Sequence, residues 1–229
     1  MNQNNTTRKG LLVNVLIKSF LFLIILCILF FLTAGSFLYW NGWLFLGSFF
    51  LPAVLLLIYF YKKDPELLAK RMQMKEKNTD QKRFVMITTP YFLLTFIIPG
   101  LDYRFGWSHM PFWLIIFGLL IFTAGYLLFF IVLRTNSFAS RIIEIQEGQK
   151  VIDSGPYALV RHPMYLSSVL VYFGMPLILG SFIMILPILV LPFALAYRIL
   201  KEEKFLRQNL TDYDKYMEKV RYRLIPGVW

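Results

Sequence analysis

Two short polar segments hold the residues of this chain that are best suited to chemistry. The first reads DSGPYALVRHPMYLS and brings Tyr157, His162 and Tyr165 together directly before a long apolar run. Its Ser-Gly-Pro opening predicts a turn. Pro163 is predicted to be the first residue of a helix, because proline disfavours helical backbone in the residue before it. His162 would then lie beside the exposed N–H groups of a helix N-terminus, which attract carboxylates and phosphates. The same residues suit a membrane-surface anchor with belt tyrosines, so composition alone leaves both interpretations open.

The second segment follows the last apolar run and contains Arg198 and Glu202. These residues are four positions apart, so they would share one face of a helix. A carboxylate at the edge of a membrane is costly unless it has a partner. The pair is therefore either an ion pair that ends a helix or a carboxylate that holds the cationic group of a ligand.

The elements that must position these segments are membrane-spanning helices. Apolar residues make up 58% of the 229 residues and occur in blocks, whereas a soluble domain spreads them by period. A span needs about 20 mostly apolar residues. By this criterion the sequence predicts spans at about 12–34, 39–61, 84–101, 111–133, 164–180 and 182–198. The predicted fold class is an all-α integral membrane protein, a helical bundle of five to six transmembrane spans that forms a single polytopic domain over residues 1–229.

The uncertainty in the span count comes from the uncharged run at 164–197. This run is too long for one span and just long enough for two short spans that turn at Gly180–Ser181. Five spans plus a re-entrant segment is the alternative.

The charge pattern predicts which parts of the chain face the cytoplasm. The net charge is +11, and connecting segments that are rich in basic residues alternate along the chain with segments that are poor in them, with one span between each. The positive-inside rule then places both termini, residues 62–83 and residues 134–161 in the cytoplasm. The two polar segments therefore lie on one side, within expected cytoplasmic segments at 134–163 and 199–229, and can meet there.

The composition also favours some partners over others. The basic surplus suits the anionic headgroups of the lipid bilayer, whereas no basic domain or recognition motif indicates nucleic-acid binding. The single cysteine, Cys27, cannot build a disulfide framework or a zinc site, so no metal ligands are predicted.

A surface helix is predicted between the second and third spans. Asp64-Pro65-Glu66 is typical of a helix start, since proline is favoured in the first turn. Leu67, Leu68 and Arg71 follow at helical spacing, which predicts an amphipathic helix on the cytoplasmic surface. A plain solvated connector is the alternative.

The motifs of both polar segments resemble those of a known family. GPYALVRHPMYLS, followed by R-x-x-x-E-E-x-x-L and Y-x-x-Y-x-x-x-V, is similar to the isoprenylcysteine carboxyl methyltransferase family, which is related to the phospholipid N-methyltransferases. The bacterial branch of that family resembles the chain over most of its length, including PGLDYRFGWS and the final VRYRLIPGVW. The shorter Arg-His-Pro-x-Tyr motif also resembles integral-membrane sterol and steroid reductases, although Met164 stands where those enzymes usually have asparagine.

The resemblance implies a methyltransferase of class EC 2.1.1 in the bacterial cell membrane, with S-adenosylmethionine (SAM) as its cofactor, bound by the cytoplasmic segments. It explains why no glycine fingerprint of a Rossmann methyltransferase occurs in the sequence. Carried over by position, the cofactor-binding residues are Gln149, Lys150, Val151, Ile152, Tyr157, His162, Pro163, Met164, Tyr165 and Glu202. Arg198 matches a substrate-binding arginine, Glu144 matches a further polar contact at a different spacing, and no catalytic residue is assigned.

The resemblance implies a lipophilic or lipid-modified acceptor, and it favours O-methylation of the carboxylate of an isoprenylcysteine-like substrate. A carboxylate acceptor needs little proton chemistry, so the enzyme would mainly position the reactants and exclude water. An amine acceptor, as in a lipid N-methyltransferase, would have to lose a proton, and His162 would be the candidate base. The sequence also leaves open an NAD(P)H-dependent membrane reductase and a non-enzymatic membrane protein.

Overall fold

The computed structural model describes residues 2–72, 86, 88–93, 95–140 and 144–229, and these residues form helices and loops with no strand among them. In chain order the helical elements are α1 (Asn2–Cys27), the π-helical turn η1 (Ile28–Leu32), α2 (Trp40–Lys63), α3 (Pro65–Met72), α5 (Ile97–Phe105), α6 (Phe112–Thr135), the 3-10 helix η2 (Gly155–Ala158), α7 (Pro163–Ile178), α8 (Ile185–Ile188), α9 (Leu191–Asn209) and α10 (Tyr213–Lys219). The helical stretches Gly10–Leu32, Trp40–Lys63 and Phe112–Thr135 are long and apolar enough to cross a membrane. The predicted fold class, an all-α membrane protein, is therefore confirmed.

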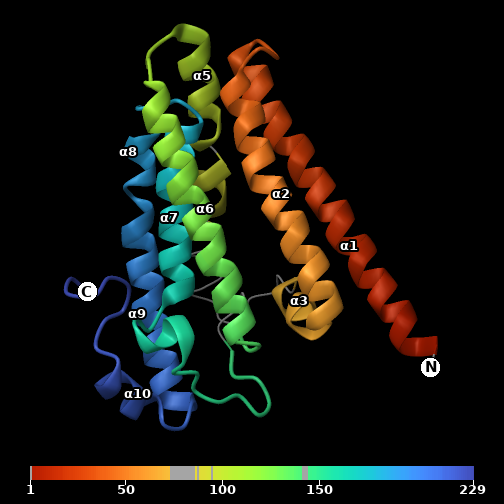
Figure 1. The fold of residues 1–229 in the computed structure, drawn as a ribbon, viewed down its shortest axis with the longest axis vertical. Helices are drawn as coiled ribbons and strands as arrows, with labels where there is room; N and C mark the ends of the chain where they lie inside the picture. The colour runs from red at the N-terminus through yellow and green to blue at the C-terminus, as the bar shows by residue number, and fades with distance from the viewer. Residues whose placement is uncertain (1, 73–85, 87, 94, 141–143) are drawn as a thin grey trace.

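The helices form an elongated bundle (Figure 1). α1 and α2 pack as a pair on one side of the bundle, and α6, α7 and α9 run alongside one another on the other side. α3, η2, α10, the start of α1 and the end of the chain lie at the same end. This end contains both polar segments of the sequence analysis, and it is the end predicted to face the cytoplasm.

The third predicted span, at 84–101, lies partly outside the described residues, at positions 84, 85, 87 and 94. Its described part is helical at 88–93, and α5 (Ile97–Phe105) ends beyond the expected end of the span. Gly106 ends this helix with a left-handed backbone (φ +65°), a conformation that glycine adopts without steric cost.

The last apolar run turns where the sequence predicted. α7 ends at Ile178, and Gly180 (φ +72°) reverses the chain before the short α8. α9 then begins at Leu191 and continues as one helix to Asn209, so the expected cytoplasmic segment at 199–229 begins inside a helix. This continuity fixes the directions in which the polar side chains of α9 point. The number of membrane crossings stays a prediction.

A buried carboxylate ties the far end of the bundle together. Asp102 in α5 accepts hydrogen bonds from the Ser108 backbone N–H at 2.6 Å and the Ser108 hydroxyl at 2.7 Å. The hydroxyl of Ser181, in the turn after α7, donates to the same carboxylate. Because its oxygens have several donors, Asp102 can stay buried at this end, and it joins α5 to the turn before α8.

α6 and α7 pack against each other through glycines. A Cβ atom added to Gly118 would lie 2.5 Å from the Leu177 Cβ and 3.1 Å from the Gly174 carbonyl oxygen. A Cβ added to Gly174 would lie 2.8 Å from the Gly118 carbonyl oxygen. The absence of side chains lets the two backbones approach closely, as in other membrane helix pairs.

Gly118→Ala is expected to destabilise the protein by about 1–3 kcal/mol, because the new methyl group would overpack the α6–α7 contact. Gly47→Ala is the matched control, since no atom lies within 4 Å of the Cβ position at Gly47 in α2. The control should be neutral or slightly stabilising, because alanine favours a helix over glycine by about 0.5–1 kcal/mol. Thermal unfolding in detergent micelles compares the two variants. Equal unfolding temperatures for both would contradict the close contact between α6 and α7.

Candidate active site

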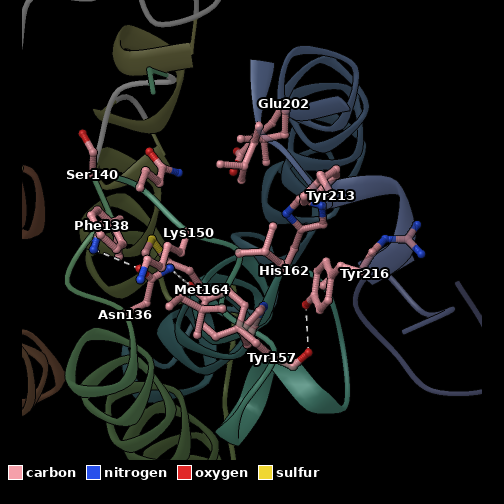
Figure 2. Close-up of a pocket in the computed structure, with 18 of the residues that line it drawn as sticks. Asn136, Phe138, Ser140, Lys150, Tyr157, His162, Met164, Glu202, Tyr213 and Tyr216 are labelled. Atoms are coloured by element: carbon pink, nitrogen blue, oxygen red, sulfur yellow. Dashed lines mark hydrogen bonds between the residues drawn. The ribbon is translucent and has the colours of Figure 1, made fainter. Parts of the chain in front are cut away.

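A polar pocket opens at the end of the bundle that holds α3 and α10. It encloses about 880 Å³ of space, its open mouth included. Figure 2 shows Glu202 and Tyr213 on one side of this pocket, with Phe138 and Ser140 on the other. All residues that the sequence analysis singled out as cofactor or substrate contacts line it: Glu144, Gln149, Lys150, Val151, Ile152, Tyr157, His162, Pro163, Met164, Tyr165, Arg198 and Glu202. Their binding roles stay predictions.

The strip at 149–152 forms one wall in a non-helical conformation. A turn precedes it, in which Gly148 is left-handed (φ +69°), the Gln149 N–H donates to the Gln146 carbonyl at 3.1 Å, and the Gln146 N–H donates to the Gln149 side-chain oxygen at 2.9 Å. After the strip, the Lys219 ammonium lies 2.7 Å from the Asp153 carboxylate and links the strip to α10. Because the strip is not helical, its backbone N–H and C=O groups do not form the hydrogen bonds of a helix and can bind a ligand.

Tyr157 fixes the position of η2 between two other segments. Its hydroxyl accepts a hydrogen bond from the Asn136 amide at 3.0 Å, and its carbonyl accepts one from the Tyr216 hydroxyl at 2.8 Å. Burial raises the pKa of Tyr157 to about 12. Its phenol is therefore protonated at neutral pH and acts as a neutral polar surface of the pocket.

The start of α7 offers fewer backbone donors than the sequence led us to expect. Pro163 has no N–H, and the N–H groups of Tyr165 and Leu166 both donate to the His162 carbonyl, at 3.1 and 3.2 Å. Among the residues that the structure describes, the Met164 N–H is the one donor of this first turn that is left to meet an anion. Side chains must therefore supply most of the recognition at this helix start.

Arg198 and Glu202 are joined through a tyrosine from the neighbouring helix. The Tyr165 hydroxyl donates to the Glu202 carboxylate at 2.5 Å, and the Arg198 Nε–H donates to the Tyr165 hydroxyl at 3.0 Å. This chain of bonds connects α7 to α9 and holds the Glu202 carboxylate at the pocket surface. The two polar segments of the sequence analysis thus meet as expected, with Tyr165 as the link.

Glu203 is the residue that the sequence analysis did not place. It is only 4% exposed and contacts two arginines and a histidine, with distances of 2.7 Å to Arg161 Nε, 3.2 Å to His162 Nε2 and 2.9 Å to Arg223 Nε. Burial alone would raise the pKa of Glu203, but hydrogen bonds from His162, Arg161 and Arg223 outweigh it and lower the pKa to about 2. Glu203 is therefore an ionised hub behind the pocket.

The same hub holds the C-terminal tail against the pocket wall. Arg161 Nη1 donates to the carbonyls of Val220 and Arg221, both at 2.8 Å. The backbone N–H groups of Arg161 and His162 donate to the carbonyls of Tyr222 and Arg223, both at 2.9 Å. His162 is thus held at both its ring and its backbone, which fixes the ring that lines the pocket.

Further lining residues were also missed by sequence reasoning, namely Asn136, Phe138, Ala139, Ser140, Arg161, Leu206, Leu210, Tyr213 and Tyr216. The signal for the two tyrosines was present, since they form the Y-x-x-Y motif of the family resemblance. Both are buried in α10, with ring centroids 5.8 Å apart. Within the described part of the chain, no group of three His, Cys, Asp or Glu residues could hold a metal ion.

Comparison with known proteins gives one finding for this region. Residues 113–212 match the family model described as phospholipid methyltransferase. The matched stretch runs from α6 through α9 and contains all the site residues that the sequence predicted. The comparison with curated proteins gives no match. The similarity to phospholipid methyltransferases, which belong with the isoprenylcysteine enzymes to one group, therefore indicates a methyltransferase of class EC 2.1.1.

Proposed function

We propose that the protein transfers a methyl group from SAM to a lipid acceptor at the cytoplasmic surface of a bacterial membrane. The observation that carries this proposal is the convergence of both polar segments in one pocket, which lies at the end of a bundle of membrane-spanning helices. The family match supports methyl transfer over reduction by NAD(P)H. Because that family is one of phospholipid methyltransferases, the match also supports a lipid as the acceptor.

The donor set of the pocket fits SAM. The Glu202 carboxylate would bind the amino group of the ligand, and Lys150 or the Met164 N–H would bind its carboxylate. The faces of Tyr157, Tyr213 and other tyrosines suit a cationic sulfonium. When bound, SAM supplies an electrophilic methyl group that an acceptor takes by in-line displacement.

We favour a carboxylate acceptor of the isoprenylcysteine type over an amine acceptor. Arg198 lines the pocket, and its guanidinium suits a carboxylate. An amine would need a base to take its proton, whereas a carboxylate acceptor needs none. The residues of this pocket are therefore better suited to orienting an anion than to removing a proton.

Calorimetry on the purified protein tests the cofactor assignment. We expect SAM to bind and NADPH not to bind, because the pocket offers a carboxylate to the amino group of SAM. SAM labelled in its methyl group should then pass the label to the lipid fraction of a membrane extract. NADPH binding without SAM binding would overturn the proposal, and binding of neither ligand would favour a non-enzymatic protein. Label that appears only on lipid amines would overturn the choice of a carboxylate acceptor.

A further inference from the structure

A second polar cavity lies on the outer face of the bundle, and we call it the tail groove. It runs between α9, α10 and the C-terminal tail, and it contains about 900 Å³ of space counted to its open side. In Figure 1 the tail lies beside α9, on the side of the bundle away from α1 and α2. The tail groove and the cofactor pocket share none of their described lining residues, so the groove is a separate cavity.

Positive charge dominates the tail groove. Lys204, Arg207 and Arg223 line it, together with the carboxylates of Glu203 and Asp214. Arg223 and Arg207 each bond one of these carboxylates through Nε, at 2.9 and 2.7 Å, and within the described residues their terminal Nη atoms form no hydrogen bond. Lys204 is exposed and has no carboxylate partner in the described part of the chain. The groove therefore has an excess of one positive charge and N–H donors that can bind an anion.

An exposed apolar stripe of α9 leads to these cations. Phe193, Tyr197 and Leu200 are exposed, and Lys204 and Arg207 follow them at spacings of three or four residues, which place all five on one helix face. The predicted span ends at 198, so the Lys204 backbone lies about 9 Å beyond the span at 1.5 Å per residue. The headgroup layer on each side of a bilayer is about 5–8 Å thick, and a lysine side chain can reach back toward it. Lys204 is therefore placed to meet a lipid phosphate.

The tail forms the opposite wall of the groove and has the residue types of a membrane interface. The Arg223 guanidinium carbon lies 5.1 Å from the centroid of the Trp229 ring, and the Arg223 N–H donates to the Trp229 carbonyl at 2.9 Å. Tyr222, Ile225 and Val228 are exposed on the same short segment. Because tryptophan and tyrosine are enriched at the level of lipid headgroups, this wall suits contact with the bilayer surface.

We propose that the tail groove binds an anionic phospholipid of the leaflet that surrounds this end of the bundle. The phosphate lies between Lys204 and Arg223, and an acyl chain lies along the apolar stripe of α9. Arg223 also bonds Glu203, the hub behind the cofactor pocket, so the bound lipid holds the tail against α9. The inference goes beyond the proposed function and does not depend on the identity of the methyl acceptor.

Native mass spectrometry tests the inference on protein released from nanodiscs that contain equal amounts of phosphatidylglycerol and phosphatidylcholine. We expect phosphatidylglycerol to stay bound preferentially, because the choline cation would be repelled by the positive groove. Excess inorganic phosphate should not displace this lipid, since burial of its acyl chain adds to the binding. Equal retention of the two lipids would overturn the role of charge, and displacement by phosphate would indicate a site for free anions and overturn the lipid.

A charge-removing variant locates the bound lipid. Lys204→Gln should lower the preference for phosphatidylglycerol about tenfold, which corresponds to the loss of one charge-assisted hydrogen bond. Lys63→Gln is the matched control, because it removes the same charge from an exposed position in the last turn of α2, outside the groove. The control should retain the full preference. An unchanged preference in Lys204→Gln, or an equal loss in both variants, would overturn the groove as the site.

A charge-adding variant makes the test independent of any loss of folding. Gln208 is exposed, lines the groove and lies one helical turn after Lys204, so Gln208→Lys should increase the preference for phosphatidylglycerol severalfold. No increase in a variant that unfolds at the wild-type temperature would contradict the inference. SAM binding is measured separately on the same samples. Failure to bind SAM would contradict the proposed function alone, whereas equal retention of the two lipids would contradict only this inference.

Discussion

Glu203→Gln is expected to lower the free energy of unfolding by about 3–5 kcal/mol, the typical cost of removing one charge from a buried ion pair. Glu203 is 4% exposed, and its carboxylate faces Arg161, His162 and Arg223. Glutamine has nearly the same shape but no negative charge, so Arg161 would stay buried without a counter-ion. The loss should appear first at the C-terminal tail, which Arg161 holds through its bonds to Val220 and Arg221.

Thermal unfolding and limited proteolysis of residues 210–229 measure this effect. Glu202→Gln is the matched control, because it makes the same chemical change one residue away at the pocket surface. The folded-state pKa of Glu203, about 2, lies below its ordinary value of 4.5. Its contribution to stability is therefore fully present above pH 4.5 and is lost as the pH falls toward 2. Equal unfolding midpoints for the two variants would show that Glu203 is not the hub.

Glu202→Gln is expected to weaken SAM binding by about tenfold to a hundredfold, which corresponds to the loss of one charge-assisted hydrogen bond. The Glu202 carboxylate lies at the pocket surface, where the Tyr165 hydroxyl holds it at 2.5 Å. Glutamine can still accept the hydrogen bond from Tyr165, so the link between α7 and α9 should persist. The variant therefore removes charge from the pocket and leaves the unfolding temperature unchanged.

Calorimetric titration with SAM measures the change in affinity. Glu218→Gln is a suitable control, since it removes the same charge from an exposed position on α10, outside the pocket. The control should bind SAM as tightly as the unaltered protein. Unchanged affinity in Glu202→Gln would remove Glu202 from the cofactor site.

The outline of the fold could be predicted from the sequence because it depends on local signals, whereas the expected site residues came from the family resemblance. Apolar blocks define the long helices, and Gly180 marks the turn in the last apolar run. The helix start at Asp64-Pro65 is confirmed, since the Asp64 carboxylate accepts the Leu67 N–H at 2.9 Å. The remainder of that predicted surface helix, at 73–83, lies outside the described residues.

The partners of Glu203 could not be predicted, because they depend on tertiary structure. Glu202 and Glu203 are equivalent in composition, and only the phase of α9 directs one toward the pocket and the other into the interior. The partners of Glu203 come from a different helix start and from the C-terminal tail. The contact of Arg71 with Met164 is equally long-range, since helical spacing gives the face of α3 and not its neighbour.

The hydrogen bonds between the C-terminal tail and residues 161–162 can form only after the tail has been synthesised. Translation and membrane insertion proceed from the N-terminus, so α1 through α9 are made before Tyr222 and Arg223 leave the ribosome. Arg161 and Glu203 are therefore without these partners until the chain has been made beyond residue 223. A chain that is truncated or stalled before Val220 would lack the bonds from Arg161 to Val220 and Arg221, and the wall behind the pocket would be unfinished.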